Sequence, residues 1–250
     1  MRFASHHAQG AAVTTAAALF VASASEAMAQ EDSQPALSVV AHVELVSDYR
    51  DRGVSYSNGE PAIQGSVILV HESGFYAGVW SSSMDDGGSG LGSLELDYLA
   101  GWAGEVSSGV IADFSLGYYT FPDAIDAPGF KTSSFEAAAS ATFPLGPAET
   151  TLGYFYAWDQ AAIGGIDNHH VYASASVPIA KTPLSLGARV GYTDGAYSSD
   201  PDRTNFDWTL SVSAEVLPPL LASVRYAGVS GPSVRNYSDD TFVLSLAAAF

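Results

Sequence analysis

The chain has 250 residues, of which 47% are hydrophobic and 14% charged, and this apolar content predicts a folded protein. Its 27 acidic residues outnumber its 9 basic ones, giving a net charge of -18. Such a charge argues against nucleic acid as a partner, because binding to phosphate backbones needs clustered Lys and Arg. The sequence has no cysteine, which excludes disulfides, thiolate metal sites and cysteine nucleophiles.

Residues 1–29 have the layout of a signal peptide. Arg2 precedes an apolar stretch over residues 10–24, and small residues at positions 27 and 29 form a cleavage pattern. A buried or membrane helix is the alternative interpretation, but the polar segment that follows favours export. We therefore assign residues 30–250 to one mature domain. That domain has no run of about 18 apolar residues that could form a transmembrane helix.

Strict alternation of apolar and polar residues dominates the mature chain. Leu94, Leu96 and Tyr98 share one face of an extended segment, whereas Glu95 and Asp97 share the other. A helix would mix these two faces. The same split recurs along the chain, and the polar face carries small or charged residues throughout. This period of two predicts β-strands.

The alternation predicts about twelve strands, within a range of ten to fourteen. Their expected residue ranges are 38–49, 61–71, 74–82, 93–103, 109–121, 133–143, 148–158, 169–179, 183–193, 204–217, 219–229 and 240–250. Each has close to the roughly 9–11 residues that a tilted strand needs to cross a bilayer. Long polar connections alternate with short ones, which is typical of an outer-membrane barrel with long loops on one rim and tight turns on the other.

Alternation alone does not say whether the apolar face points outward to lipid or inward, as in a secreted β-protein. An even strand count, alternating loop lengths and aromatic residues at the ends of the apolar stripes favour lipid outside. Those aromatic residues are Trp80, Trp102, Tyr154, Trp158, Tyr192, Phe206 and Trp208. The last strand ends in Phe250 and resembles the terminal signal by which outer-membrane proteins are recognised for insertion.

We therefore predict an all-β, transmembrane, antiparallel up-and-down β-barrel in the cell outer membrane. Its expected partners are outer-membrane lipid, lipopolysaccharide and the barrel assembly machinery. If the polar face lines a lumen, the pore-lining candidates are Glu44, Asp48, Glu95, Asp97, Asp113, Glu136, Arg189, Asp207, Glu215 and Arg225. The acidic excess predicts a weakly cation-selective pore for small hydrophilic solutes or ions, because carboxylates concentrate cations.

An alternative to an open, cation-selective pore is that the lumen carboxylates pair with the arginines and plug a narrow barrel. His42 is a further, pH-sensitive member of the polar face. In the first loop, Arg50 and Arg52 lie close to Asp48, and we interpret them as a structural clamp on a lumen carboxylate rather than as a contact to solute.

Three histidines need a separate interpretation. His169 and His170 are adjacent, so on a strand they point to opposite faces and do not share a metal ion. His71 and Ser73 have the two-residue spacing found in some outer-membrane phospholipases, but they fall at a predicted tight turn. We expect no enzyme, no cofactor and no metal site.

Residues 47–82 carry a family resemblance. The segments SDYRDRGVS at 47–55, PAIQG at 61–65 and HESGFYAGVW at 71–80 resemble, in order and spacing, the TorF family of porin-like proteins of Gram-negative bacteria. Asp51 departs from the family pattern, which has an aromatic residue there. The resemblance implies an outer-membrane β-barrel with a channel role and no catalytic residue. A non-conducting barrel with a structural or adhesive role is the alternative, followed by a secreted β-protein.

Overall fold

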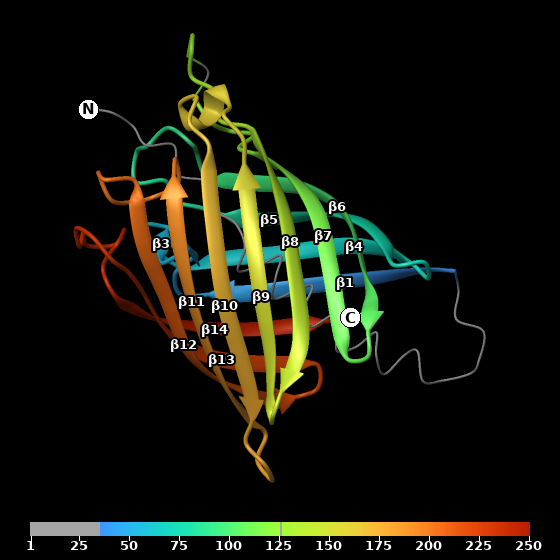
Figure 1. Cartoon of the computed structure of the whole chain (residues 1–250). Coiled ribbons are helices and arrows are strands. Elements are labelled where there is room, and N and C mark those ends of the chain that lie inside the picture. Colours follow the sequence, from blue (N-terminus) through green and yellow to red (C-terminus); the bar gives the residue numbers. More distant parts are fainter. Residues whose placement is uncertain (1–35, 126) are drawn as a thin grey trace.

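The computed structural model describes residues 36–125 and 127–250, so the predicted signal peptide lies outside the described residues. Twelve antiparallel strands close into one barrel (Figure 1). No helix in these two ranges is long and apolar enough to cross a membrane. The predicted all-β, twelve-stranded, up-and-down barrel is confirmed.

The barrel strands follow one another in chain order around the wall. They are β1 (Leu37–Val46), β4 (Ala62–His71), β5 (Phe75–Ser83), β6 (Leu94–Ser107), β7 (Val110–Thr120), β8 (Ser134–Leu145), β9 (Ala148–Ala157), β10 (Asn168–Pro178), β11 (Leu184–Gly195), β12 (Thr204–Leu217), β13 (Leu220–Val229) and β14 (Thr241–Ala249). A 3₁₀ turn, η1, covers Ala161–Ile163, and two short strands, β2 (Arg50–Asp51) and β3 (Val54–Ser55), lie in the first loop.

The seam of the barrel joins the first and last strands. Only residues 42–46 of β1 pair with β14, from His42 opposite Ala249 to Val46 opposite Ser245. The backbone groups of Ala41 and Phe250 add a reciprocal pair of hydrogen bonds. All ten residues of β1, in contrast, pair with β4.

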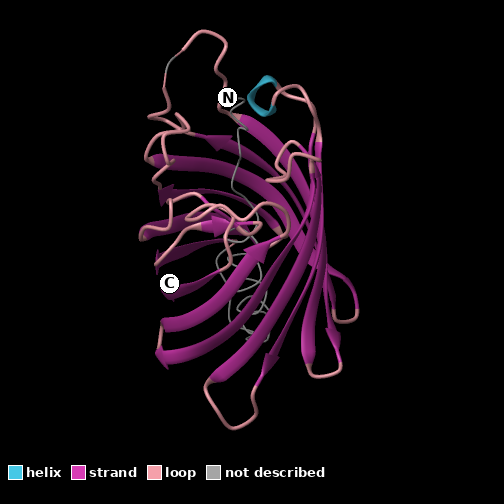
Figure 2. Cartoon of the chain, turned by 90° about the vertical axis from the view of Figure 1, so that its left-hand side faces the viewer, coloured by secondary structure: helices cyan, strands magenta, loops and turns pink. Residues whose placement is uncertain are grey.

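The connections differ between the two ends of the barrel (Figures 1 and 2). Long connections, over residues 47–61, 84–93, 121–133, 158–167, 196–203 and 230–240, gather at what we call the loop end. Short connections such as residues 72–74, 108–109 and 146–147 make the opposite end, the turn end. The predicted alternation of loop lengths is thus confirmed.

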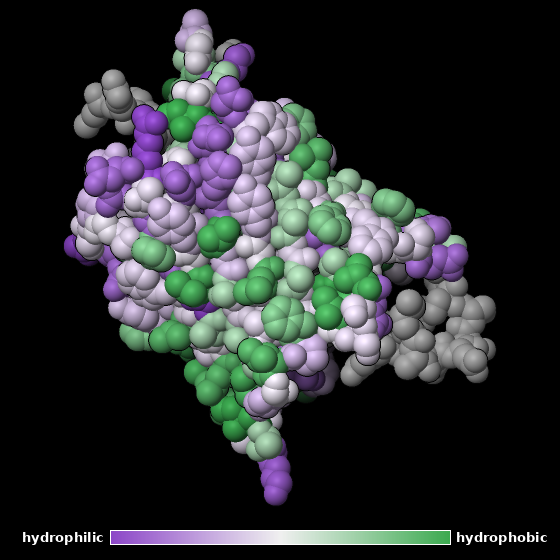
Figure 3. All heavy atoms as spheres, in the orientation of Figure 1, coloured by the Kyte–Doolittle hydropathy of each residue, from purple (hydrophilic) through white to green (hydrophobic). Residues whose placement is uncertain are grey.

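The apolar face of the strands points outward. On β6, Leu94 and Tyr98 are 39% and 48% exposed on the outside, whereas Glu95 and Asp97 are 0% and 2% exposed inside. Apolar residues spread over the middle and the turn-end part of the outer wall, and hydrophilic residues gather near the loop end (Figure 3). This orientation rules out the alternative of a soluble barrel with an apolar interior.

Aromatic residues circle the outer wall near the loop end. The Tyr118 and Phe135 rings lie 4.5 Å apart, and Phe135 stacks on Trp158 at 5.9 Å. Trp80 is an exception, because its predicted place in this outer girdle is wrong. Its side chain points inward, is 3% exposed, and packs on Tyr49 of the first loop with ring centroids 5.6 Å apart. The Trp80 indole faces inward because it packs on the Tyr49 ring inside the barrel.

Candidate functional site

The first loop folds into the barrel. Strands β2 and β3 form a hairpin in which Arg50 pairs with Ser55 and Asp51 with Val54. We call residues 48–57 the lumen hairpin. Its two turn residues, Arg52 and Gly53, have φ of 47° and 81°, as a two-residue hairpin turn of type I′ requires. A side chain at Gly53 would collide with the backbone of β13, so the tip of the lumen hairpin touches that strand.

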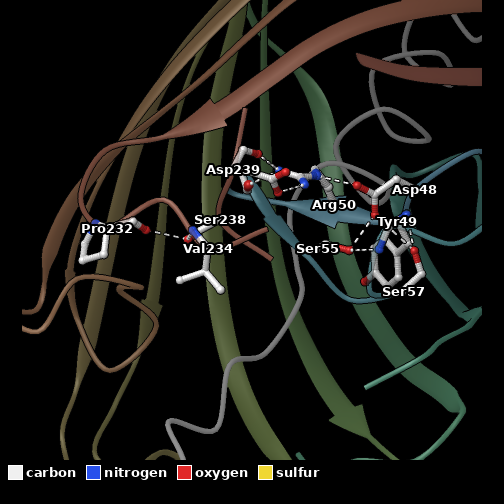
Figure 4. A network of polar contacts seen from close by, with 11 residues as sticks. Asp48, Tyr49, Arg50, Ser55, Ser57, Pro232, Val234, Ser238 and Asp239 are labelled. Carbon is white, nitrogen blue, oxygen red and sulfur yellow. Dashed lines mark hydrogen bonds and ion pairs between the residues drawn. The ribbon is translucent and has the colours of Figure 1, made fainter. Parts of the chain in front are cut away.

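The base of the lumen hairpin is held by a polar network (Figure 4). Asp48 accepts hydrogen bonds from the hydroxyl groups of Ser55 and Ser57, at 2.6 and 3.1 Å. Nε of Arg50 donates to Asp48 at 2.5 Å, and the same guanidinium donates to the backbone carbonyl and, at 3.0 Å, to the carboxylate of Asp239. Asp48 was predicted as part of a pore-lining strand, but it lies beyond β1 and stabilises the hairpin instead.

The tip of the lumen hairpin carries a buried ion pair. Nη2 of Arg52 donates to both carboxylate oxygens of Glu136 on β8, at 3.0 and 2.9 Å. The guanidinium also lies 5.1 Å above the Phe155 ring and 5.5 Å above the Tyr197 ring. Burial disfavours its charge, but Glu136 and Asp51 outweigh this effect and hold the pKa of Arg52 above its usual range. The predicted clamp of a first-loop arginine on a lumen carboxylate is confirmed.

Aromatic residues anchor the root of the lumen hairpin on β5. The Tyr49 ring packs at 5.5 Å from Tyr56 and at 5.6 Å from Trp80 on β5. The hydroxyl of Tyr49 donates to Oε2 of Glu95 on β6 at 3.0 Å. The lumen hairpin therefore crosses the barrel, with its root held by apolar packing and its tip by charge.

A second polar cluster lies on β10, β11 and β12. Arg189 hydrogen-bonds Nε2 of His170 at 3.0 Å, contacts the Asp207 carboxylate at 3.4 Å and covers the Tyr172 ring at 4.6 Å. His170 is fully buried, and its Nδ1 lies 2.9 Å from the hydroxyl of Thr193. The sequence predicted only that His169 and His170 face opposite ways, and the pairing of His170 with Arg189 depends on the register between β10 and β11.

The remaining candidates are more loosely arranged. Arg225 lies 3.7 Å from Glu44, with their side chains 28% and 13% exposed. The Tyr76 hydroxyl donates to the Asp113 carboxylate and lies 3.0 Å from both of its oxygens. Glu215 is exposed near the turn end, beside an irregularity in the pairing of β12 with β13, and lies apart from the other candidates.

The interior is acidic even after these pairings. Eight carboxyl groups of the lumen hairpin and the inner wall face four arginines, an excess of four acidic residues. The carboxylates are Glu44, Asp48, Asp51, Glu95, Asp97, Asp113, Glu136 and Asp207, and the arginines are Arg50, Arg52, Arg189 and Arg225. Among the described residues, one oxygen each of Glu95 and Asp97 is buried without a hydrogen-bond partner.

His169 and His71 lie outside the lumen, whereas His42 shares the inward face of β1 with Glu44. His169 is exposed on the outer wall, where its Nδ1 meets the Tyr154 hydroxyl at 2.6 Å, so it faces away from its buried neighbour as predicted. His71 and Ser73 are exposed at the turn end, with Nδ1 and Oγ 2.7 Å apart. Within residues 36–125 and 127–250, no three His, Asp or Glu side chains are grouped so that they could hold a metal ion.

Comparison with known proteins places this barrel in a family. A family model described as "Bacterial protein of unknown function (Gcw_chp)" matches residues 29–250. The chain belongs to the Gcw_chp family. No curated protein matches it.

Solved structures of porins resemble the Gcw_chp barrel. One is the "KdgM porin in complex with disordered oligogalacturonate", with a TM-score of 0.57 and 7% identity over 85% of this chain and 99% of that chain. Another is the NanC porin, with a TM-score of 0.56 and 8% identity over the same shares of the two chains. At such low identity the likeness shows the fold alone, which is the barrel fold of outer-membrane porins.

Proposed function

We propose that this protein is an outer-membrane channel through which small hydrophilic solutes or ions diffuse passively. The observation that carries the proposal is a closed barrel with an apolar outer wall and a polar, charged interior. The mechanism involves no chemistry and no cofactor. The porin folds of KdgM and NanC support it, as does the resemblance of residues 47–82 to the TorF family.

The channel is weakly cation-selective. Carboxylates exceed arginines by four in the lumen, and an acidic lining raises the local concentration of cations and lowers that of anions. The KdgM porin was solved with an oligogalacturonate, which is a polyanion. The acidic interior of this barrel favours ligands of the opposite charge.

The outer wall and its aromatic belt are suited to lipid and lipopolysaccharide in the outer membrane. Exposed Leu, Val and Phe side chains cover the strands, and the ring formed by residues such as Tyr118, Phe135 and Trp158 lies where an interface girdle would be. The apolar alternation of β14, which ends before Phe250, fits recognition by the barrel assembly machinery during insertion.

One observation favours a second candidate, a non-conducting barrel with a structural or adhesive role. The lumen hairpin contacts β5, β6, β8, β9 and β13, and most of its side chains are buried. A plug held on so many sides would narrow or block the lumen.

Conductance of the refolded chain in a planar bilayer distinguishes the two candidates. Reversal potential is recorded across a potassium chloride gradient, with heat-denatured protein as the control. Discrete steps with a potassium preference are expected for the channel. A barrel that migrates as a folded, heat-modifiable species but never conducts would overturn the channel and leave the structural role.

A further inference from the structure

We infer that the lumen hairpin is a gate latched by the Arg52–Glu136 ion pair, and that its opening uncovers Glu95, Asp97 and Glu136 as the cation-selective lining of the pore. This inference rests on the proposed channel function. Arg52 and Glu136 then control the size of the passage, and the three carboxylates determine its preference for cations.

The two ends of the lumen hairpin are attached in different ways. The root is packed on the wall by Tyr49 and Tyr56, which lie against Trp80. The tip is attached through Arg52, whose bidentate contact with Glu136 joins it to β8. Apolar contacts are non-directional, whereas the hydrogen bonds of an ion pair are lost when its partners separate. This asymmetry makes the root a hinge and the tip a latch.

At the root, the Tyr49 hydroxyl bonds Glu95 on the wall, but the polar contacts of Arg50 and Ser55 lead to a loop. Arg50 donates to Asp239, and the backbone N–H of Ser55 donates to the carbonyl of Tyr237. Both partners belong to the 230–240 connection between β13 and β14. The lumen hairpin and this connection can therefore move together while the strands of the barrel stay in place.

The closed arrangement leaves polar atoms without partners. In the described part of the chain, Nε and Nη1 of Arg52, Oε1 of Glu95 and Oδ1 of Asp97 are buried and make no hydrogen bond. Such atoms cost free energy when they are shielded from water. Opening the lumen hairpin returns them to water, which lowers the free energy of the open state relative to the closed one.

Like charges meet beneath the closed lumen hairpin. Asp51 lies near enough to Glu95 and Asp97 to repel both electrostatically. Glu95, Asp97 and Glu136 are 0%, 2% and 1% exposed, so in the closed arrangement they cannot line an open passage. Arg52 is the arginine that contacts this group, through Glu136. When Arg52 leaves with the lumen hairpin, the wall behind it carries three carboxylates.

The lumen hairpin has little stability of its own. It has two residue pairs, between Arg50 and Ser55 and between Asp51 and Val54, and an isolated two-stranded hairpin is marginal in water. Its position thus depends on the contacts at its two ends, and loss of one of them shifts the population between closed and open states.

The first test compares single-channel recordings of five proteins: the full chain, Arg52→Gln, Glu136→Gln, the charge swap Arg52→Glu with Glu136→Arg, and Lys181→Gln. The last removes an exposed cation at the turn end, in the connection between β10 and β11. We expect the two latch variants to raise the open probability about tenfold. Lys181→Gln leaves the open probability unchanged, and the charge swap restores a value near that of the original chain.

The second test follows the lumen hairpin without relying on conductance. Because the chain has no cysteine, Ser82→Cys introduces a single thiol at a side chain that is 1% exposed and pairs in register with Glu95. A charged methanethiosulfonate reagent should modify it about tenfold faster when Arg52→Gln or Glu136→Gln is added. Ser108→Cys, exposed at the turn end, is the matched control and should react at one rate in every background.

The outcomes separate the gate from the channel. Latch variants that fold but react at the original rate at position 82 overturn the gate, whether or not the barrel conducts. Faster modification in a barrel that never conducts supports the moving hairpin and overturns the channel function. If Arg52→Gln does not fold, Glu136→Gln and the charge swap give the same comparison. Higher conductance without a shift of the reversal potential towards potassium overturns the assignment of the carboxylates as the selective lining.

Discussion

Two regions of the lumen hold similar ion pairs at different exposure to water. Near the loop end, the side chains of Arg52 and Glu136 are 4% and 0% exposed and form a bidentate ion pair. Further along the lumen, Arg225 and Glu44 are 28% and 13% exposed and lie 3.7 Å apart. Glu136, Glu44 and Arg225 lie on inward faces of barrel strands, whereas Arg52 belongs to the lumen hairpin. The difference arises because the inserted lumen hairpin shields the Arg52–Glu136 pair from water. A loop between two strands can therefore bury residues that would otherwise face a water-filled lumen.

Removing the inserted segment should have the largest effect. Replacement of residues 50–55 by a short Gly-Ser linker is expected to raise the single-channel conductance by roughly threefold or more, because the passage at the loop end widens. Replacement of residues 180–182, in the exposed connection at the turn end, by a Gly-Ser linker is the control and should leave the conductance unchanged. An unchanged conductance in the first variant would mean that the narrowest point lies elsewhere.

The two ion pairs should differ in their contribution to stability. Glu136→Ala leaves Arg52 without its carboxylate partner, and we expect the free energy of unfolding to fall by about 2–3 kcal/mol. Breaking a permanently buried pair costs ~3–5 kcal/mol. The loss is smaller here because opening of the lumen hairpin returns Arg52 to water. Glu44→Ala breaks the more exposed pair with Arg225 and should cost about 1 kcal/mol or less. The free energy of unfolding in urea, measured in lipid vesicles, gives both values. Equal losses would contradict the distinction.

Two glycines with the same backbone conformation test the contact between the hairpin tip and the wall. Gly53 and Gly129 have φ of 81° and 82°, but a side chain would collide with Gly228 only at the first, and would meet nothing within 4 Å at the second. Gly129→Ala should lower the free energy of unfolding by about 1–2 kcal/mol, which is the penalty for a side chain in the left-handed backbone region alone. Gly53→Ala should cost more and raise the open probability of the channel. Equal unfolding free energies would place the tip away from β13.

The smallest expected effect is a pH dependence in the 84–93 loop, which lies outside the lumen. Burial tends to raise the pKa of Asp86, but backbone N–H donors, including those of Gly90 and Gly92 at 2.7 and 2.8 Å, outweigh it and lower the pKa. The stabilisation is therefore present above the ordinary aspartate pKa of about 3.9 and is lost as pH falls through the depressed value.

Amide hydrogen exchange of this loop, corrected for its intrinsic pH dependence, should accordingly be faster at acidic pH. Asp86→Asn should abolish that change while leaving the lumen hairpin protected. Loop protection that stays constant down to full protonation of Asp86 would contradict the role of its carboxylate.

The alternation of apolar and polar residues was enough to predict the strands of the barrel wall and the faces of their side chains. Leu94, Glu95 and Asp97 were assigned to the correct faces, and the strand boundaries agree with the predicted ranges to within four residues. The lumen hairpin was not predicted, because its position depends on partners far away in sequence, such as Glu136. One signal was present in the sequence: Trp80 shares the inward parity of β5, and an indole ring on a polar face needs an apolar partner inside the barrel.

The short seam between β1 and β14 has a kinetic consequence. Its pairs, from His42 with Ala249 to Val46 with Ser245, join residues about two hundred positions apart, and contacts of such high sequence separation form late because loop closure must precede them. The lumen hairpin follows β1 directly and its base is bonded to Asp239, just before β14. Its docking is therefore expected to follow closure, so that a newly assembled barrel passes through a stage with an unobstructed interior before it acquires its plug.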